Sequence, residues 1–309
     1  MDRAYIEVVR LLLESAPSIF ETTPHFAMKG GTAINLFIED MPRLSVDIDV
    51  VYTDHQATRD NALKSISSAL ETARKRLAIA DVKAEVSSTK DGDEIKLFIR
   101  RGRNQVKVEV NHVFRGTVLP VETRRLGEEA RMLFTTELSA PLLATPELYG
   151  SKLVAAMDRQ HPRDLFDVRR LFERGGLTAD VVECFVCYLA GHNRPVHEVL
   201  FSRDQDMSLA FENEFTGLTR DPITLAELKE VRRELKKKLP VALTVNQRQF
   251  LLGLVRGEPD WTLMNCPHLS RLPAIRWKLQ NLARLKKSNP DKFAQQAELL
   301  RTNLAESPD

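Results

Sequence analysis

Residues 29–36 read KGGTAINL and residues 43–49 read RLSVDID, and these two stretches decide how the N-terminal half of the chain folds. The double glycine predicts a turn that opens an apolar helix. The second stretch predicts a strand with two aspartates two positions apart. Because strand residues alternate between faces, we expect Asp47 and Asp49 on one face and Ile48 in the core.

This pairing of glycines and acids favours chemistry on phosphates. Two carboxylates on one face repel each other unless a cation lies between them, and Mg²⁺ binds such oxygens together with substrate phosphates. Gly30 and Gly31 let the backbone approach a ligand closely, and Thr32 begins a helix whose N–H groups favour an anion. Either motif alone is a common turn or a solvated strand end. Together they indicate phosphoryl or nucleotidyl transfer.

Composition is that of a soluble globular protein with one large domain or two ordinary ones. The 309 residues are 43% hydrophobic and 28% charged, with a net charge of +2. No signal peptide and no apolar run long enough to span a membrane is found, so we expect a cytoplasmic protein without a membrane partner. Three cysteines fit a reducing compartment.

Periodicity predicts an α/β lobe over residues 1–138 and a helical lobe over residues 139–309. The lobe boundary is placed where short strands give way to continuous helical patterning. The expected helices and strands of the first lobe are helices over 4–15, 32–39 and 58–79, strands over 26–28, 43–52, 82–88, 95–99 and 105–111, and one or two short strands over 112–140. A turn signal stands at residues 91–93.

A third acid stands on the strand over residues 105–111. Its valines alternate with polar residues, so Glu109 shares the face opposite the valines and can lie beside the aspartate pair. A solvent-facing position on an edge strand would explain Glu109 equally well.

The second stretch with candidate chemistry covers residues 145–168. Lys152 lies among uncharged neighbours and is expected to point inward, where an ammonium would neutralise charge on transferred phosphates. Asp164 and Asp167 are one helical turn apart. The residues alone also permit a surface lysine and a capping pair between Arg163 and Asp164.

These motifs resemble a known family. Gly30-Gly31-Thr32-Ala33 and Arg43-x-Ser45-x-Asp47-Ile48-Asp49 look like the first motif of AbiEii/AbiGii-type toxins. Those toxins are nucleotidyltransferases of the DNA polymerase β superfamily, the MenT toxins among them, and are usually half of a toxin–antitoxin system. The family's later motif, a lysine-bearing helix and then Arg-Asp-x-x-Asp, is matched by Lys152 and residues 163–167. Segments 257–261 and 272–279 also resemble the family's helical lobe.

The resemblance implies an α+β fold, with a polymerase β-like mixed sheet, flanking helices and a helical lobe whose first helices complete the site. It implies transfer of a nucleoside monophosphate from an NTP to an acceptor hydroxyl. The roles it implies are catalytic for Asp47, Asp49, Lys152 and Asp167; nucleotide-binding for Gly30, Gly31, Thr32, Ser45 and Lys152; and Mg²⁺-binding for Asp47, Asp49 and Glu109. Asp167 would touch substrate or activate the hydroxyl, while Asp164 would pair with Arg163.

The resemblance also implies an acceptor and a regulator. The acceptor would be the 3′ end of tRNA, which suits basic segments over 229–238 and 271–287. A cognate antitoxin is expected, and in some relatives it phosphorylates the residue equivalent to Ser45, where added charge would block metal and nucleotide. Alternatives are a small-molecule or protein acceptor, and a non-catalytic RNA- or protein-binding module on a transferase fold.

Three further expectations concern the remaining residues. Cys184 and Cys187 stand in an apolar helix without a second pair, which indicates buried thiols. Trp261 and Trp277 are expected to be packing anchors. Ala substitutions at Asp47 or Lys152 are expected to abolish growth inhibition and leave the fold intact.

Overall fold

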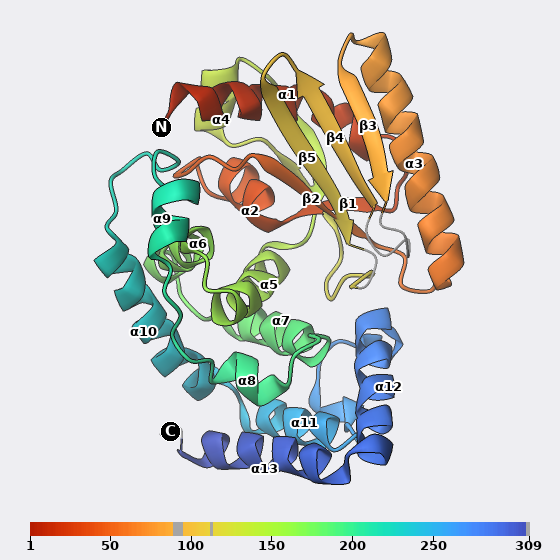
Figure 1. The fold of residues 1–309 in the computed structure, drawn as a ribbon, viewed down its shortest axis with the longest axis vertical. Helices are drawn as coiled ribbons and strands as arrows, with labels where there is room; N and C mark the ends of the chain where they lie inside the picture. Colours follow the sequence, from red (N-terminus) through yellow and green to blue (C-terminus); the bar gives the residue numbers. More distant parts are fainter. Residues whose placement is uncertain (89–94, 112–113, 307–309) are drawn as a thin grey trace. The chain divides into compact units, whose positions relative to one another are not determined.

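The computed structural model describes residues 1–88, 95–111 and 114–306, and the chain forms two compact units (Figure 1). The first unit comprises Met1–Leu148 and Thr216–Pro222, and the second comprises Tyr149–Phe215 and Ile223–Asp309. The units divide at Leu148, inside a helix, whereas the domain boundary near residue 138 stays a prediction. The turn predicted at residues 91–93 lies outside the described residues.

A seven-stranded mixed sheet forms the centre of the first unit, in the order β3-β4-β5-β2-β1-β7-β6. The strands are β1 (Phe26–Lys29), β2 (Asp47–Tyr52), β3 (Lys83–Ser88), β4 (Ile95–Arg101), β5 (Asn104–Asn111), β6 (Glu122–Arg125) and β7 (Ser139–Leu142). Strand β2 runs antiparallel to β1 and parallel to β5, so it lies near the middle of the sheet. The predicted α+β fold with a mixed sheet and flanking helices is confirmed.

Apolar alternation explains why the central strands bury one face. In β2, Ile48 and Val50 are fully buried, whereas Asp47 and Asp49 are half-buried on the opposite face. In β5, Val106 and Val108 are fully buried. The helices of this unit are α1 (Arg3–Phe20), α2 (Gly30–Ala33), the π-helical turn η1 (Ile34–Ile38), α3 (Arg59–Ile79) and α4 (Glu128–Phe134). Helix α3 packs against β3 and β4 (Figure 1).

The segment before β2 corrects the predicted start of that strand. The strand was expected from residue 43 but begins at Asp47, because residues 42–44 pair with a distant segment instead. Arg43 forms an isolated antiparallel bridge with Thr219, and the Leu44 N–H donates to the Leu218 carbonyl at 2.9 Å.

Helices make up the second unit, as predicted. Helix α5 (Thr145–Asp158) begins in the first unit and continues into the second. The other helices are α6 (Pro162–Glu173), α7 (Ala179–Ala190), α8 (Val196–Leu200), α9 (Ser208–Glu214), α10 (Leu225–Ala242), α11 (Val245–Val255), α12 (Pro273–Ser288) and α13 (Pro290–Glu306), with 3₁₀ turns at Trp261–Leu263 and Leu269–Arg271. Reciprocal side-chain caps start α10 and α11, at Thr224 and Thr244.

The core of the second unit centres on α7. Cys184 and Cys187 are buried on this helix, as predicted. Helix α5 approaches α7 closely at Gly150, where an added Cβ would lie 2.6 Å from the Cβ of Cys184. Trp261 packs on Phe250 with ring centroids 5.9 Å apart, so its anchoring role is confirmed.

Trp277 is not a packing anchor, because 45% of its surface is exposed. The prediction was wrong since Ala274, Ile275, Lys278 and Leu282 form the buried side of α12 and turn the indole outward. No helix within the described part of the chain is long and apolar enough to cross a membrane.

Candidate active-site residues in two clusters

A first cluster, here the glycine–aspartate cluster, consists of Gly30, Gly31, Thr32, Asp47 and Asp49. The register of β1 and β2 pairs Lys29 with Asp49, so the chain leaves β1 beside the acid-bearing end of β2. Gly30 then turns with φ +74°, a left-handed conformation that favours glycine. A Cβ at this position would lie 2.2 Å from Oδ2 of Asp49. The Asp49 carboxylate therefore rests directly against the backbone of Gly30.

Gly31 makes room for a buried cation. A Cβ at Gly31 would lie 2.6 Å from Nη2 of Arg43 and 3.1 Å from the Ser45 hydroxyl. Arg43 is only 1% exposed, and its Nη1 donates to the Leu44 carbonyl at 3.0 Å. Sequence reasoning gave Arg43 no separate role, because only the fold places its guanidinium beneath the double glycine.

Thr32 fixes the start of the helix to the acid-bearing strand. Its hydroxyl donates to the main-chain carbonyl of Asp47 and lies 3.0 Å from the Ser45 hydroxyl. One turn later, the Asn35 amide donates to the Gly31 carbonyl at 2.9 Å. These hydrogen bonds hold the glycine turn and the aspartates in one arrangement.

Ser45 does not share a strand face with the two aspartates, because it precedes β2. It is buried beneath Gly31 and next to Thr32. A phosphate on Ser45 would have to displace these neighbours as well as add charge. Phosphorylation of Ser45 stays a prediction.

Glu109 lies beside Asp49, but two lysines hold it. The parallel register pairs Asp49 with Glu109 directly. Lys96 Nζ lies 3.0 Å from Oε1 of Glu109, and Lys107 Nζ lies 3.2 Å from Oε2. Partial burial raises the pKa of this carboxyl, yet the hydrogen bond from Lys96 and the charge of Lys107 outweigh it and lower the pKa. Among described residues, no group of three or more His, Cys, Asp or Glu side chains is placed to hold a metal.

If the chain carries out the nucleotidyl transfer that the resemblance implies, we expect Glu109→Gln to change its rate by less than about 10-fold, because Lys96 and Lys107 already neutralise the carboxylate. The variant should be slightly less stable at pH 7. A lowered pKa means that this stabilisation is present above the ordinary glutamate pKa of about 4.3 and is lost as pH falls through the folded-state value. Thermal melts at pH 7 and pH 3 check the stability difference. A fall of 100-fold with a raised Mg²⁺ requirement would instead make Glu109 a metal ligand.

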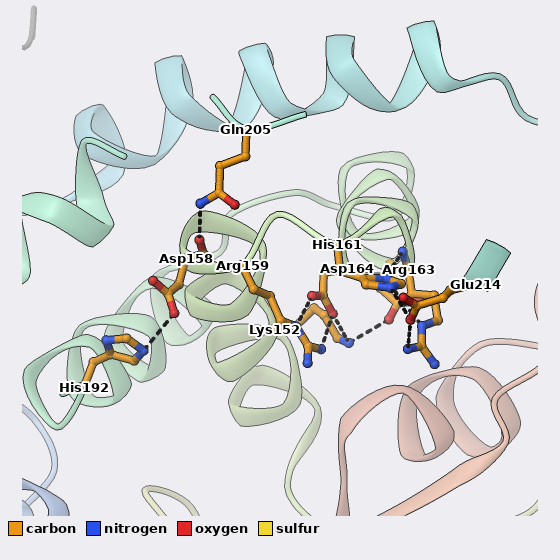
Figure 2. Close-up of polar contacts among 10 residues, drawn as sticks. Lys152, Asp158, Arg159, His161, Arg163, Asp164, His192, Gln205 and Glu214 are labelled. Carbon is orange, nitrogen blue, oxygen red and sulfur yellow. Dashed lines mark hydrogen bonds and ion pairs between the residues drawn. The ribbon is translucent and has the colours of Figure 1, made fainter. Parts of the chain in front are cut away.

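A second cluster, here the lysine–aspartate cluster, consists of Lys152, Arg159, Asp164 and Asp167. Lys152 Nζ donates to Oδ1 of Asp164 at 2.9 Å and lies 3.0 Å from Oδ2 of Asp167. The Arg159 guanidinium donates two hydrogen bonds to the Asp164 carboxylate, at 2.6 and 2.9 Å (Figure 2). Both carboxylates are fully buried and Lys152 is 6% exposed, so the predicted inward direction of Lys152 is confirmed.

The cations determine the protonation of Asp164. Burial by itself raises the pKa of this carboxyl, but the charge of Lys152 and the hydrogen bonds from Arg159 hold the pKa far below its ordinary value. Asp164 is therefore ionised at neutral pH, with Lys152 and Arg159 both within hydrogen-bond distance of its carboxylate.

The predicted pair between Arg163 and Asp164 is wrong. Asp164 points toward α5, while Arg163 Nη2 lies 3.6 Å from Glu214 of α9 (Figure 2). The turn is held by His161 instead, whose Nδ1 accepts from the Arg163 N–H at 3.1 Å. Its Nε2 lies 3.1 Å from Glu214. Burial and the Arg163 charge lower the pKa of His161, so the ring is neutral and donates to Glu214.

The structure thus groups the predicted site residues into two sets. Gly30, Gly31 and Thr32 adjoin Asp47 and Asp49 in the first unit. Lys152 adjoins Asp167 in the second unit. Each cluster belongs to its own compact unit, so their convergence on one nucleotide stays a prediction.

Comparison with known proteins identifies a family and a similar solved structure. The family model described as "Nucleotidyl transferase AbiEii toxin, Type IV TA system" matches residues 11–281. Among solved structures, the chain is similar to MenT4, a nucleotidyltransferase toxin from Mycobacterium tuberculosis H37Rv, with a TM-score of 0.59 and 18% sequence identity. That match covers 90% of this chain and 93% of the other. No curated protein matches the chain in sequence.

Proposed function

The chain belongs to the AbiEii family of nucleotidyltransferase toxins of type IV toxin–antitoxin systems, and from this membership we propose that it transfers a nucleoside monophosphate from an NTP to the 3′ end of tRNA. Such a transfer would block translation and growth. We further propose that the protein acts in the cytoplasm and is neutralised by a cognate antitoxin.

The observation that carries the proposal is the contact between Gly30 and Asp49. A side chain at Gly30 would displace the Asp49 carboxylate, and the left-handed φ of +74° at this position also favours glycine. The backbone turn at Gly30 can approach phosphates closely, and it contacts Asp49, whose carboxylate can bind the Mg²⁺ that accompanies those phosphates. A glycine kept only for a surface turn would face open space, as Gly102 and Gly257 do.

The donor set suits Mg²⁺. Asp47 and Asp49 present hard oxygen ligands from one face of β2 and would hold the ion together with phosphate oxygens. When bound, Mg²⁺ supplies charge neutralisation of the triphosphate. Gly30 and Gly31 would position the phosphates, and Arg43 beneath Gly31 adds positive charge to that place.

Lys152 would meet the charge that develops on the leaving pyrophosphate. An ammonium has three N–H donors, and Asp164 and Asp167 take two of them. We propose that Asp167 positions Lys152, because its carboxylate is fully buried against that lysine. A direct role of Asp167 on the acceptor hydroxyl stays a prediction and requires the carboxylate to become accessible.

The test supplies each α-labelled NTP separately with Mg²⁺ and purified tRNA. Half of the tRNA is treated with periodate, which destroys the terminal diol and leaves the remainder of the molecule unchanged. We expect one nucleotide to label intact tRNA, no label on oxidised tRNA, and no label when EDTA is present. Asp47→Asn protein serves as the inactive reference.

The other outcomes separate the alternatives. Label that appears only on a small molecule or on protein would overturn the proposed acceptor and retain the transferase chemistry. Equal labelling of intact and oxidised tRNA would exclude the 3′ end. No label with any nucleotide would favour a non-catalytic binding module.

A further inference from the structure

The structure separates two basic segments that look alike in sequence. On α10, most cations have a nearby acid. Arg233 pairs with Glu230, and Lys238 Nζ lies 2.5 Å from Glu234. Lys236 Nζ lies 3.0 Å from Asp204. The face of α10 is thus largely neutralised, and its run of lysines is that of a solvated, salt-bridged helix.

Helix α12 differs because it carries no acid of its own, and Asp291 follows only after the helix has ended. Residues 261–290 contain no aspartate or glutamate. Arg276, Arg284 and Lys287 are exposed on α12, and within the described chain none of the three forms an ion pair. At 3.6 residues per turn, these three cations fall within an arc of about 80°, which extends to about 100° with position 277. They form one positive face.

An exposed tryptophan lies in the same arc. Trp277 is 45% exposed, and the Arg284 guanidinium lies 5.5 Å from the centroid of its ring. Such a cation–π contact restrains both side chains at the surface. We define the α12 face as Arg276, Trp277, Arg284 and Lys287.

The opposite side of α12 is anchored, so the face is held outward. Lys278 is buried, and its ammonium donates to the carbonyls of His192 and Arg194 at 2.8 and 2.7 Å. Ile275 and Leu282 are buried beside it. A helix fixed on this side cannot rotate to hide the indole.

We propose that the α12 face is a docking surface for an RNA strand. Three cations without acid partners match a polyanion, and an exposed indole offers a flat surface on which a base can stack. An acidic protein would also satisfy the cations, and Trp and Arg are common at protein interfaces. We favour RNA because exposed cations beside an exposed indole are the arrangement that backbone contact and base stacking on a single strand require. The choice of RNA over DNA rests on the proposed function, whereas the face itself does not.

The experiment measures RNA binding without catalysis. Full-length protein carrying Asp47→Asn, without NTP, is titrated into fluorescein-labelled tRNA and into a labelled single-stranded 20-nucleotide RNA, and anisotropy is followed over a range of salt. We expect Trp277→Ala to weaken binding about 5- to 100-fold. Arg284→Glu should weaken it by at least 10-fold and reduce the slope of log Kd against log salt by about 0.7.

Lys237→Glu on α10 is the matched control for Arg284→Glu, because it makes the same charge change at an exposed cation of the other basic segment. We expect it to bind RNA within about 2-fold of the parent. Circular dichroism and thermal melts confirm that every variant is folded, and Trp277→Phe should restore part of the binding by keeping an aromatic ring.

Several results would overturn the proposal. Parent-like binding by Trp277→Ala and Arg284→Glu would do so, as would equal losses in Arg284→Glu and Lys237→Glu. Loss of antitoxin binding with RNA binding unchanged would make the face a protein interface. Absence of nucleotide transfer with these binding results intact would count against the proposed function alone.

Discussion

Asp49→Asn is expected to slow nucleotidyl transfer about 10³-fold, which corresponds to about 4 kcal/mol of lost transition-state stabilisation. Asparagine keeps the shape of the side chain against Gly30 but removes the negative charge that would hold Mg²⁺. The fold should not suffer, because removing one of two like charges on the same face of β2 relieves repulsion. Single-turnover transfer of labelled nucleotide measures the rate, and a thermal melt measures stability.

Glu85→Gln is the control for Asp49→Asn, since Glu85 lies on β3 of the same sheet with a side chain that is 72% exposed. It should retain the parent rate. A parent rate in Asp49→Asn would contradict the assignment of the acids. A low rate together with a large loss of stability would show that Asp49 serves the fold instead.

Lys152→Met is expected to lower the free energy of unfolding by about 3–5 kcal/mol, because it removes the cation shared by two fully buried carboxylates. The structure therefore revises the expectation that a Lys152 variant keeps its fold intact. The pKa of Asp164 is lowered, so its contribution is present above the ordinary aspartate value of about 3.9 and fades as pH falls below it. The difference in free energy of unfolding between the parent and Lys152→Met should therefore become smaller as the pH falls. Urea denaturation at pH 7 and pH 3 measures both values.

Two companion variants separate charge burial from a general loss of packing. Adding Asp167→Asn to Lys152→Met removes one of the uncompensated charges and should recover about 2 kcal/mol. Lys229→Met, at an exposed position on α10, should change stability by less than about 0.5 kcal/mol. If Lys152→Met is as stable as Lys229→Met, the ion-pair cluster contributes nothing measurable to folding.

Local patterns predicted the central sheet well. The alternating valines of β5 and the apolar positions of β2 are sufficient to define which faces are buried, because a strand has a fixed period of two. The same period places Asp47 and Asp49 together without any knowledge of their neighbours. The double glycine was recognised as a close approach, although its partners Asp49 and Arg43 came only from the fold.

Predictions failed where a distant residue decides a local arrangement. Glu214 competes for Arg163 from more than fifty residues away, so the local pair with Asp164 does not form. Lys96 reaches Glu109 across β4 and β5, a neighbour that no spacing along one strand reveals. The prediction that Trp277 is a packing anchor failed because a tryptophan can lie on either face of an amphipathic helix. The buried Lys278, which donates to the His192 carbonyl, shows that the other face of α12 is the buried one.

The bridge between residues 43–44 and the segment Thr216–Pro222 constrains how this protein is made. The chain leaves the first unit at Leu148, builds part of the second, and returns for seven residues before leaving again. During synthesis, the main-chain pairing of Arg43 and Leu44 with Thr219 and Leu218 can form only after residues 218 and 219 have emerged from the ribosome. The main-chain pairing just before the two aspartates therefore forms late. A polypeptide that ended after the sheet would lack this pairing.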